Sequence, residues 1–274
     1  MNHAVGTVSL RKADVSGFVF WTRNVRPCLG NLEALRNQDI PFFVQFTATA
    51  YPRLLEPRVI AVADAIAQMR TLSSRFGSAS VVWRYDPILL SNLSTFEFHV
   101  ENFQYMSRGL SGVVVEVVTS FVHGYAKTYA NLKKAGGCTE FEWYDPALDE
   151  RHSMIAQLVQ IANENGMRLS ICSQLASLVE GASEARCVDT ERLSRIAQRA
   201  IVSREKGNRP ECRCAASRDI GAYDTCPHGC AYCYAVRNRD LALRRYKEHD
   251  PLGEFLFEPT ESTLQRTGDL FQII

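Results

Sequence analysis

Short runs of β-branched and aromatic residues alternate along the chain with segments in which apolar residues recur at helical spacing. The runs Phe42–Thr49 and Val113–Phe121 are rich in Val, Phe and Thr, which is typical of buried strands. In Val59–Arg75 and Leu148–Asn165 the apolar residues recur every three or four positions, which predicts helices with one buried face. The pattern predicts six strands, at Phe18–Thr22, Phe42–Thr49, Ser80–Tyr85, Val113–Phe121, Thr139–Trp143 and Arg168–Cys172.

This alternation of strands and helices is typical of βαβ units, and it predicts an α/β fold with a parallel sheet. Six strands are enough for a partial (β/α) barrel and are also compatible with a complete TIM-like barrel. In either case we expect the chemistry at the carboxyl ends of the strands. A polar connector, residues 201–210, separates this barrel portion, residues 1–205, from a cysteine-rich segment, residues 206–274, which contains a basic helix at about Val236–His249.

Composition narrows the class of protein. The 274 residues carry a formal charge of +1, which gives no general field for attracting nucleic acid, so we do not expect nucleic acid as a partner. No stretch reaches the roughly 18 apolar residues of a membrane helix, and the first residues do not resemble a secretory signal. We therefore expect a cytoplasmic protein, in which nine cysteines indicate metal binding or catalysis rather than disulfides.

Three of these cysteines, Cys226, Cys230 and Cys233, have the spacing C-x3-C-x2-C. Three thiolates on one short loop suit three irons of a [4Fe–4S] cluster and leave the fourth iron without a protein ligand. The amino and carboxylate groups of S-adenosylmethionine are able to chelate that open position. The spacing therefore predicts a cluster that reduces S-adenosylmethionine.

Tyr232 stands directly before the third cysteine, and the loop Cys226–Ala235 resembles that of the radical S-adenosylmethionine superfamily, in particular spore photoproduct lyase and its relatives. The resemblance implies that Tyr232 lies near the adenine of S-adenosylmethionine. We count Tyr232 and His228 as candidate cofactor-binding residues. It also implies an external reductant, such as flavodoxin or ferredoxin, and a substrate that the sequence does not identify.

More of the chain resembles an uncharacterised bacterial family, classed as a domain of unknown function, that carries its C-x3-C-x2-C motif near the C-terminus. The superfamily loop usually follows the first strand, so its late position here implies a circularly permuted barrel. The resemblance covers roughly residues 7 to 255, and the matching segments are Val19–Asn24, Gln45–Thr47, Trp83–Ile88 and Ser217–Tyr223.

A zinc site is the alternative for the cysteines of the C-terminal segment, because zinc also favours paired cysteine knuckles. It would join Cys212 and Cys214 to Cys230 and Cys233, with His228 as an alternative ligand. Cys226 would then have no role in metal binding.

Four other cysteines are enough for a second, fully ligated [4Fe–4S] cluster: Cys172, Cys187, Cys212 and Cys214. Cys172 ends a predicted strand and is expected to face the active end of the barrel. The alternative is that Cys172 is a core cysteine and Cys187 an incidental loop thiol.

Three charged residues are candidates for catalysis or substrate binding. Arg84 and Asp86 end a predicted strand, where Arg84 would hold a carboxylate and Asp86 a ribose hydroxyl, or the two would simply pair with each other. Glu116 lies in an apolar strand, where a buried carboxylate needs a partner or a raised pKa.

The function predicted from these observations is a radical S-adenosylmethionine enzyme that generates a 5′-deoxyadenosyl radical. One alternative is a DNA repair enzyme similar to spore photoproduct lyase. Another is a non-catalytic iron–sulfur or zinc protein.

Overall fold

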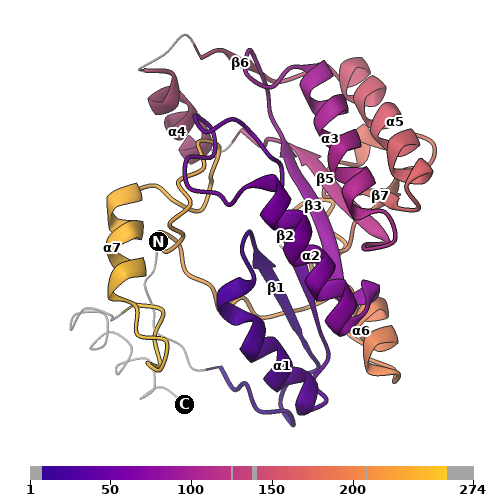
Figure 1. Cartoon of the computed structure of the whole chain (residues 1–274), viewed down its shortest axis with the longest axis vertical. Helices are drawn as coiled ribbons and strands as arrows, with labels where there is room; N and C mark the ends of the chain where they lie inside the picture. The colour runs from indigo at the N-terminus through magenta and orange to yellow at the C-terminus, as the bar shows by residue number, and fades with distance from the viewer. Residues whose placement is uncertain (1–7, 125, 138–140, 208, 258–274) are drawn as a thin grey trace.

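A computed structural model describes residues 8–124, 126–137, 141–207 and 209–257. The fold is mixed α/β and is built on one six-stranded sheet in the order β1-β2-β3-β5-β7-β8, in which every neighbouring pair is parallel (Figure 1). The strands are β1 (Phe18–Thr22), β2 (Phe42–Thr47), β3 (Val81–Ile88), β5 (Glu116–Phe121), β7 (Arg168–Ile171) and β8 (Ser183–Glu184). The predicted parallel sheet is confirmed.

Helices cover one face of this sheet. Because consecutive strands are neighbours and parallel crossovers are right-handed, the connecting helices fall on the same side. These helices are α1 (Leu29–Asn37), α2 (Val62–Phe76), α3 (Phe96–Leu110) and α5 (Leu148–Glu164). Their apolar residues and those on one face of the strands form the main core, in which Trp83, Phe46 and Met69 are fully buried. The helices predicted at Val59–Arg75 and Leu148–Asn165 are thus confirmed, as α2 and α5.

The sheet is open. Strands β1 and β8 each have a neighbour on one side only, so the strands of the described residues do not close into a barrel. The complete barrel among our expectations is therefore wrong for this part of the chain. The physical reason is the strand count, since a TIM barrel needs eight strands and β8 contributes only two residues.

The strand predicted at Thr139–Trp143 is also absent from the main sheet. Strand β6 (Trp143–Tyr144) pairs antiparallel with β4 (Leu90–Ser91) in a separate two-stranded sheet, while Thr139 lies outside the described residues. In this run Glu140 and Glu142 alternate with aromatic residues. A strand buried on both faces of a parallel sheet needs a more continuous apolar run.

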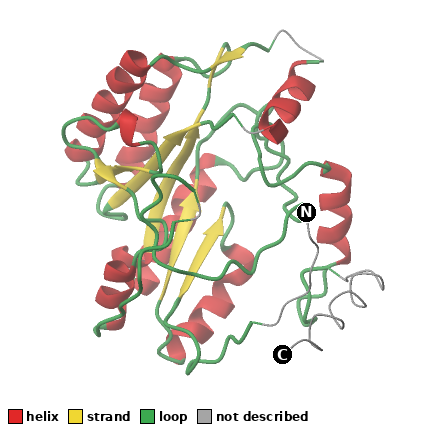
Figure 2. Cartoon of the chain, turned by 180° about the vertical axis from the view of Figure 1, so that it is seen from behind, coloured by secondary structure: helices red, strands yellow, loops and turns green. Residues whose placement is uncertain are grey.

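The sheet face opposite α1, α2, α3 and α5 is called here the inner face. The chain between β8 and about residue 216 crosses it, mostly as loop, with α6 (Thr190–Ala197) as its helix (Figure 2). Phe43, Val82 and Val118 of the sheet pack against Leu193 and Ile201 of this cover in a second, smaller core. The inner face is therefore a buried layer between the sheet and a loop-rich cover.

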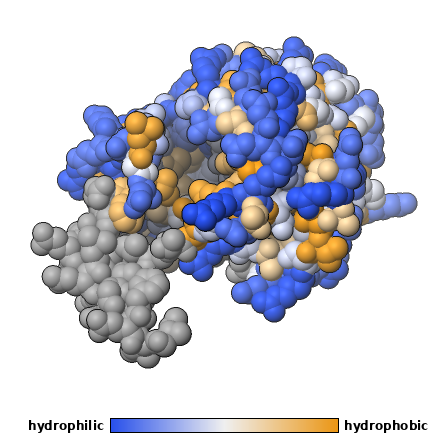
Figure 3. Space-filling view, turned by 90° about the horizontal axis from the view of Figure 1, so that it is seen from below, coloured by the Kyte–Doolittle hydropathy of each residue, from blue (hydrophilic) through white to orange (hydrophobic). Residues whose placement is uncertain are grey.

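The remaining elements lie beside the sheet. Helix α4 (Ala126–Gly136) follows β5, and α7 (Arg239–Glu248) confirms the helix predicted at Val236–His249. Viewed from below, the surface is hollowed between the part that carries α7 and the main body (Figure 3). Single 3-10 turns occupy Arg26–Cys28, Ser78–Ser80 and Leu175–Ser177. Among the described residues, no helix combines the length and the apolar character that crossing a membrane requires.

Candidate functional site

Cys226, Cys230 and Cys233, called here the loop group, lie on one irregular loop near the carboxyl ends of β1 and β2. The amide of Ala231 donates to the carbonyl of Leu55 (2.8 Å), which fastens the loop to the segment after β2. Burial raises the pKa of Cys230 to about 12, and the neighbouring thiols of Cys233 and Cys226 add to this rise. The three thiols therefore lie close enough to influence one another.

A buried polar network anchors the loop through Tyr232. Arg23, just after β1, donates to the Tyr232 hydroxyl (2.6 Å) and to the Glu56 carboxylate (2.7 Å). The Tyr232 hydroxyl also donates to Glu56, which in turn accepts from Thr49. The Tyr232 ring packs edge-on against Tyr51, with centroids 5.5 Å apart. The aromatic residue next to the third cysteine is thus held to the ends of β1 and β2; its role beside an adenine stays a prediction.

Two further contacts position the loop group. Nδ1 of His228 lies 3.2 Å from the carbonyl of Arg58 and donates to it, so this nitrogen serves the backbone. Burial lowers the pKa of His228, which favours the neutral ring. On the other side, Asn131 of α4 donates to the carbonyls of Cys233 (2.9 Å) and Val236 (2.8 Å). The loop is therefore held by α4 as well as by the sheet.

Arg84 and Asp86 lie on the inner face of β3 and pair with each other at 2.6 Å. Burial alone would raise the pKa of Asp86, but the Arg84 guanidinium outweighs it and the pKa is lowered. Ser120 also donates to Asp86. The Arg–Asp pair that the sequence left open as an alternative is therefore present, and Arg84 reaches beyond it to the sulfur of Cys187 (3.0 Å).

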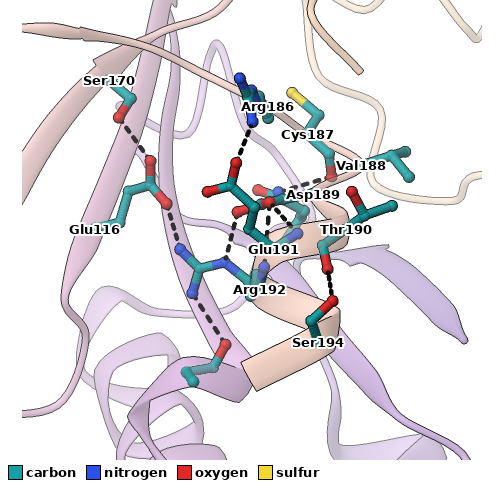
Figure 4. A network of polar contacts seen from close by, with 12 residues as sticks. Glu116, Ser170, Arg186, Cys187, Val188, Asp189, Thr190, Glu191, Arg192 and Ser194 are labelled. Atoms are coloured by element: carbon teal, nitrogen blue, oxygen red, sulfur yellow. Dashed lines mark hydrogen bonds and ion pairs between the residues drawn. The ribbon is translucent and has the colours of Figure 1, made fainter. Parts of the chain in front are cut away.

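Glu116 is part of an ion-pair network at the opposite, amino-terminal end of the sheet (Figure 4). Its carboxylate accepts from Arg192 of α6, from Ser170 (2.6 Å) and from Arg168 (3.1 Å). Burial would raise the pKa of Glu116, but Arg192 and its other partners lower it. These partners account for the buried carboxylate, and they join the cover to the sheet rather than to the loop group.

Cys172, Cys187, Cys212 and Cys214, called here the inner group, meet on the inner face. The sulfurs of Cys172 and Cys187 are 3.3 Å apart, and the Cys214 thiol lies close enough to those of Cys187 and Cys212 for both to affect its pKa. Cys212 and Cys214 thus pack with the inner group, whereas Cys230 and Cys233 pack with Tyr51 and Tyr232. The structure does not gather the four cysteines of the zinc alternative.

A mononuclear metal site is not preformed in either group. Across residues 8–257, apart from the short gaps named above, no three His, Cys, Asp or Glu side chains are arranged around one point as ligands of a single ion. The expectation for both groups is a polynuclear cluster, in which each thiolate binds its own iron.

Several residues of the site lie beyond the sequence-based candidates. Glu56 and Asn131 anchor the loop group, and Arg209 donates to the sulfur of Cys172 (3.1 Å). Glu56 precedes Pro57 in a loop, and Asn131 lies in a helix whose sequence is rich in lysine and alanine. Neither residue belongs to a motif that would indicate a role near the cysteines. Only the fold brings them to the cysteines. Cys138 lies outside the described residues.

The comparison with protein families finds one match, over residues 1–235, to the family described as "Domain of unknown function (DUF1848)". The chain belongs to this family. No curated protein matches the chain, and no solved structure does. The family covers both the sheet and the loop group, so the two cysteine groups described above belong to one family domain.

Proposed function

We propose that the protein is a radical S-adenosylmethionine enzyme: a [4Fe–4S] cluster on Cys226, Cys230 and Cys233 would cleave S-adenosylmethionine reductively and supply a 5′-deoxyadenosyl radical that abstracts hydrogen from a substrate. The observation that carries the proposal is the loop group itself. Its three thiols share one short loop and influence one another, and the polar residues around the loop are already paired. Three thiolates are the donor set of a cluster with one open iron.

The location of the loop group supports the proposal. In open α/β sheets, ligands bind outside the carboxyl ends of the strands. The loop lies at the ends of β1 and β2 although about two hundred residues separate it from them in sequence, as the contact between Arg23 and Tyr232 records. A partial barrel whose cluster loop is displaced to the end of the chain, as in a circular permutation, accounts for this arrangement.

The protein's own residues would hold the loop in place. Arg23 and Glu56 fix the Tyr232 side chain, so the loop does not depend on a bound cofactor for its anchoring. Cys230 is buried, whereas Cys226 is exposed, so the edge of the loop at Cys226 is accessible to a small electron-transfer protein such as flavodoxin or ferredoxin. Arg84 and Asp86 are the candidates for contact with the substrate, which is unknown.

The test is an anaerobic assay with iron, sulfide, dithionite and S-adenosylmethionine. The wild type is expected to make 5′-deoxyadenosine, and Cys230→Ala is expected to make none because the cluster loses a ligand. Cys28→Ala is the matched control, since Cys28 lies at the start of α1 and contacts neither group; it should keep wild-type activity. Equal product from the wild type and Cys230→Ala would refute the proposal.

The alternatives give different outcomes in the same experiment. A non-catalytic iron–sulfur or zinc protein would bind metal through the loop group and leave S-adenosylmethionine intact. A repair enzyme would add an affinity for duplex DNA that falls steeply with salt, because phosphate contacts release counterions.

A further inference from the structure

The inner group assembles cysteines from three separate segments of the chain. Cys172 follows β7 directly, Cys187 lies three residues after β8, and Cys212 and Cys214 lie on the loop that crosses the inner face. Each sulfur is in contact with at least one other: Cys172 with Cys187, Cys187 with Cys214, and Cys214 with Cys212. Four thiols in one connected contact group give the ligand count of a closed cluster.

Cationic and amide donors point at these sulfurs. Arg84 donates to Cys187 (3.0 Å), Arg209 donates to Cys172 (3.1 Å), and the amide of Val188 donates to Cys214 (3.4 Å). Buried thiols of an ordinary core do not need such partners, because a neutral thiol behaves as a small apolar group. Once metal binding has removed the protons, these guanidinium groups would act as counter-charges to the thiolates.

Three of the four thiols in the group are also closed to solvent. Cys172, Cys187 and Cys214 are each less than 10% exposed, and the carbonyl of Cys187 accepts from Gln45 of β2. The loop group differs, because it includes the exposed Cys226. A closed site with four protein ligands leaves no open iron for a small molecule.

Two simpler interpretations fit less well. The sulfurs of Cys172 and Cys187 are too far apart for a disulfide bond, which spans about 2.05 Å. In a tetrahedral zinc site four sulfurs surround one ion at about 2.3 Å, and the described residues gather no three ligands in that way; zinc is distinguished from iron by the metal analysis below.

We propose that Cys172, Cys187, Cys212 and Cys214 hold a second, fully ligated [4Fe–4S] cluster on the inner face, with Arg84 and Arg209 as its counter-charges. Each thiol loses its proton when it binds iron. Cys172 and Cys187 would have to move apart to bind separate irons. Because Arg84 also pairs with Asp86, the cluster would lie next to the candidate substrate residues. The proposal is independent of the proposed function, since it needs no cleavage of S-adenosylmethionine.

The experiment measures iron and acid-labile sulfide per chain after anaerobic reconstitution. The wild type is expected to hold about eight irons, and Cys187→Ala and Cys230→Ala about four each. The double variant should hold almost none. A Cys187→Ala variant with the full iron content of the wild type would overturn the proposal, and so would zinc that is lost with Cys187.

Further variants distinguish a loss of the cluster from a failure to fold and from a failure of the proposed function. If Cys187→Ala does not fold, Cys212→Ala serves instead, because Cys212 is less buried than Cys187; it should also halve the iron content. Cys28→Ala should keep the full iron content. The Cys230→Ala variant should retain about four irons even if the wild type makes no 5′-deoxyadenosine, so a failure of the proposed function leaves this test intact.

Discussion

The loop group and the inner group solve the same problem of gathering thiols in opposite ways. The loop group comes from eight consecutive residues, Cys226 to Cys233, and its thiols are neighbours before the chain folds. The inner group comes from the residue after β7, the chain after β8 and the crossing loop, and these span more than forty residues, from Cys172 to Cys214. One group therefore needs the fold only for anchoring, whereas the other exists only in the folded chain.

The two groups should therefore respond differently to substitutions elsewhere in the chain. Damage to the sheet or to the cover should disperse the inner group while the three cysteines of the loop remain neighbours in sequence. Damage near Tyr232 should detach the loop group and leave the inner group in place. The following variants test that division, from the largest expected effect to the smallest.

The strongest separation is expected from Glu116→Ala. Arg192, which is 1% exposed, then keeps only the more distant carboxylate of Asp189 (3.9 Å), and breaking a buried ion pair costs about 3–5 kcal/mol of the free energy of unfolding. Urea unfolding measures the loss, and thiol labelling under native conditions should show the inner group becoming accessible.

Arg168→Ala is the control, because Arg168 is the solvent-exposed partner of the same carboxylate. It should cost less than about 1 kcal/mol. A similar cost for both variants would contradict the idea that the pair between Glu116 and Arg192 holds the cover to the sheet.

The next largest effect is expected from acid, which should lower the free energy of unfolding through His99, a residue that packs against Tyr51 near the loop group. His99 lies beneath Tyr51 and contacts the Tyr85 hydroxyl (2.9 Å), and burial lowers its pKa to about 4. In the unfolded chain its pKa is about 6.5. The unfolded state therefore binds the proton first, and stability falls as the pH drops from about 6.5 to 4, by about 3 kcal/mol.

The measurement is urea unfolding as a function of pH for the wild type and His99→Gln. The variant should lose most of this pH dependence. What remains should come from His123 and His228 and, at the acid end of the range, from the carboxyl groups of Asp86 and Glu116, because the pKa values of all four are lowered. An unchanged pH profile in His99→Gln would show that His99 is not the group responsible.

Tyr232→Phe should have a moderate effect confined to the loop group. The variant keeps the ring on Tyr51 but removes the hydroxyl that Arg23 and Glu56 share, which costs about 1–3 kcal/mol for hydrogen bonds to charged groups. Thermal unfolding measures it. Tyr246→Phe on the exposed face of α7 is the matched control and should change stability by less than about 0.5 kcal/mol. Equal effects would refute the anchoring role of Tyr232.

The smallest effect is expected at the start of α6. Asp189 caps this helix by accepting from the amides of Glu191 (2.9 Å) and Arg192 (3.2 Å), and Asp189→Ala should cost about 1 kcal/mol. Asp189→Asn retains a capping oxygen and should lose only a fraction of that, as denaturant unfolding would show. If Asn costs as much as Ala, the charge rather than the cap holds this part of the cover.

The same division describes what the sequence predicts and what it does not. The pattern of apolar residues predicts seven of the elements, because a strand or helix that is buried on one face or both has apolar residues at regular spacing. These elements are β1, β2, β3, β5, β7, α2 and α5. Strand β8 has two residues and shows no such spacing. The strand predicted at Thr139–Trp143 is wrong for the main sheet, because two of the five residues in this run are glutamates and it lacks the continuous apolar character of a buried strand.

The candidate site divides in the same way. The spacing of the loop group is visible in the sequence, since its geometry is local. The partners that hold it have no local signature, because Glu56 is 176 residues from Tyr232 and Asn131 is 102 residues from Cys233. For the inner group the sequence supplied four cysteines as candidates, but only the folded chain brings Arg84 and Arg209 to their sulfurs.

The short separation between Cys172 and Cys187 has a consequence for how the protein survives air. Dioxygen that takes two electrons and two protons from this pair would join the sulfurs as a disulfide, after a movement of about 1 Å. Two of the four ligands of the inner group would then be unable to bind iron, while the loop group could still bind its cluster. Exposure to air before iron is added should thus leave the chain half-filled, and a dithiol reductant should restore its full capacity.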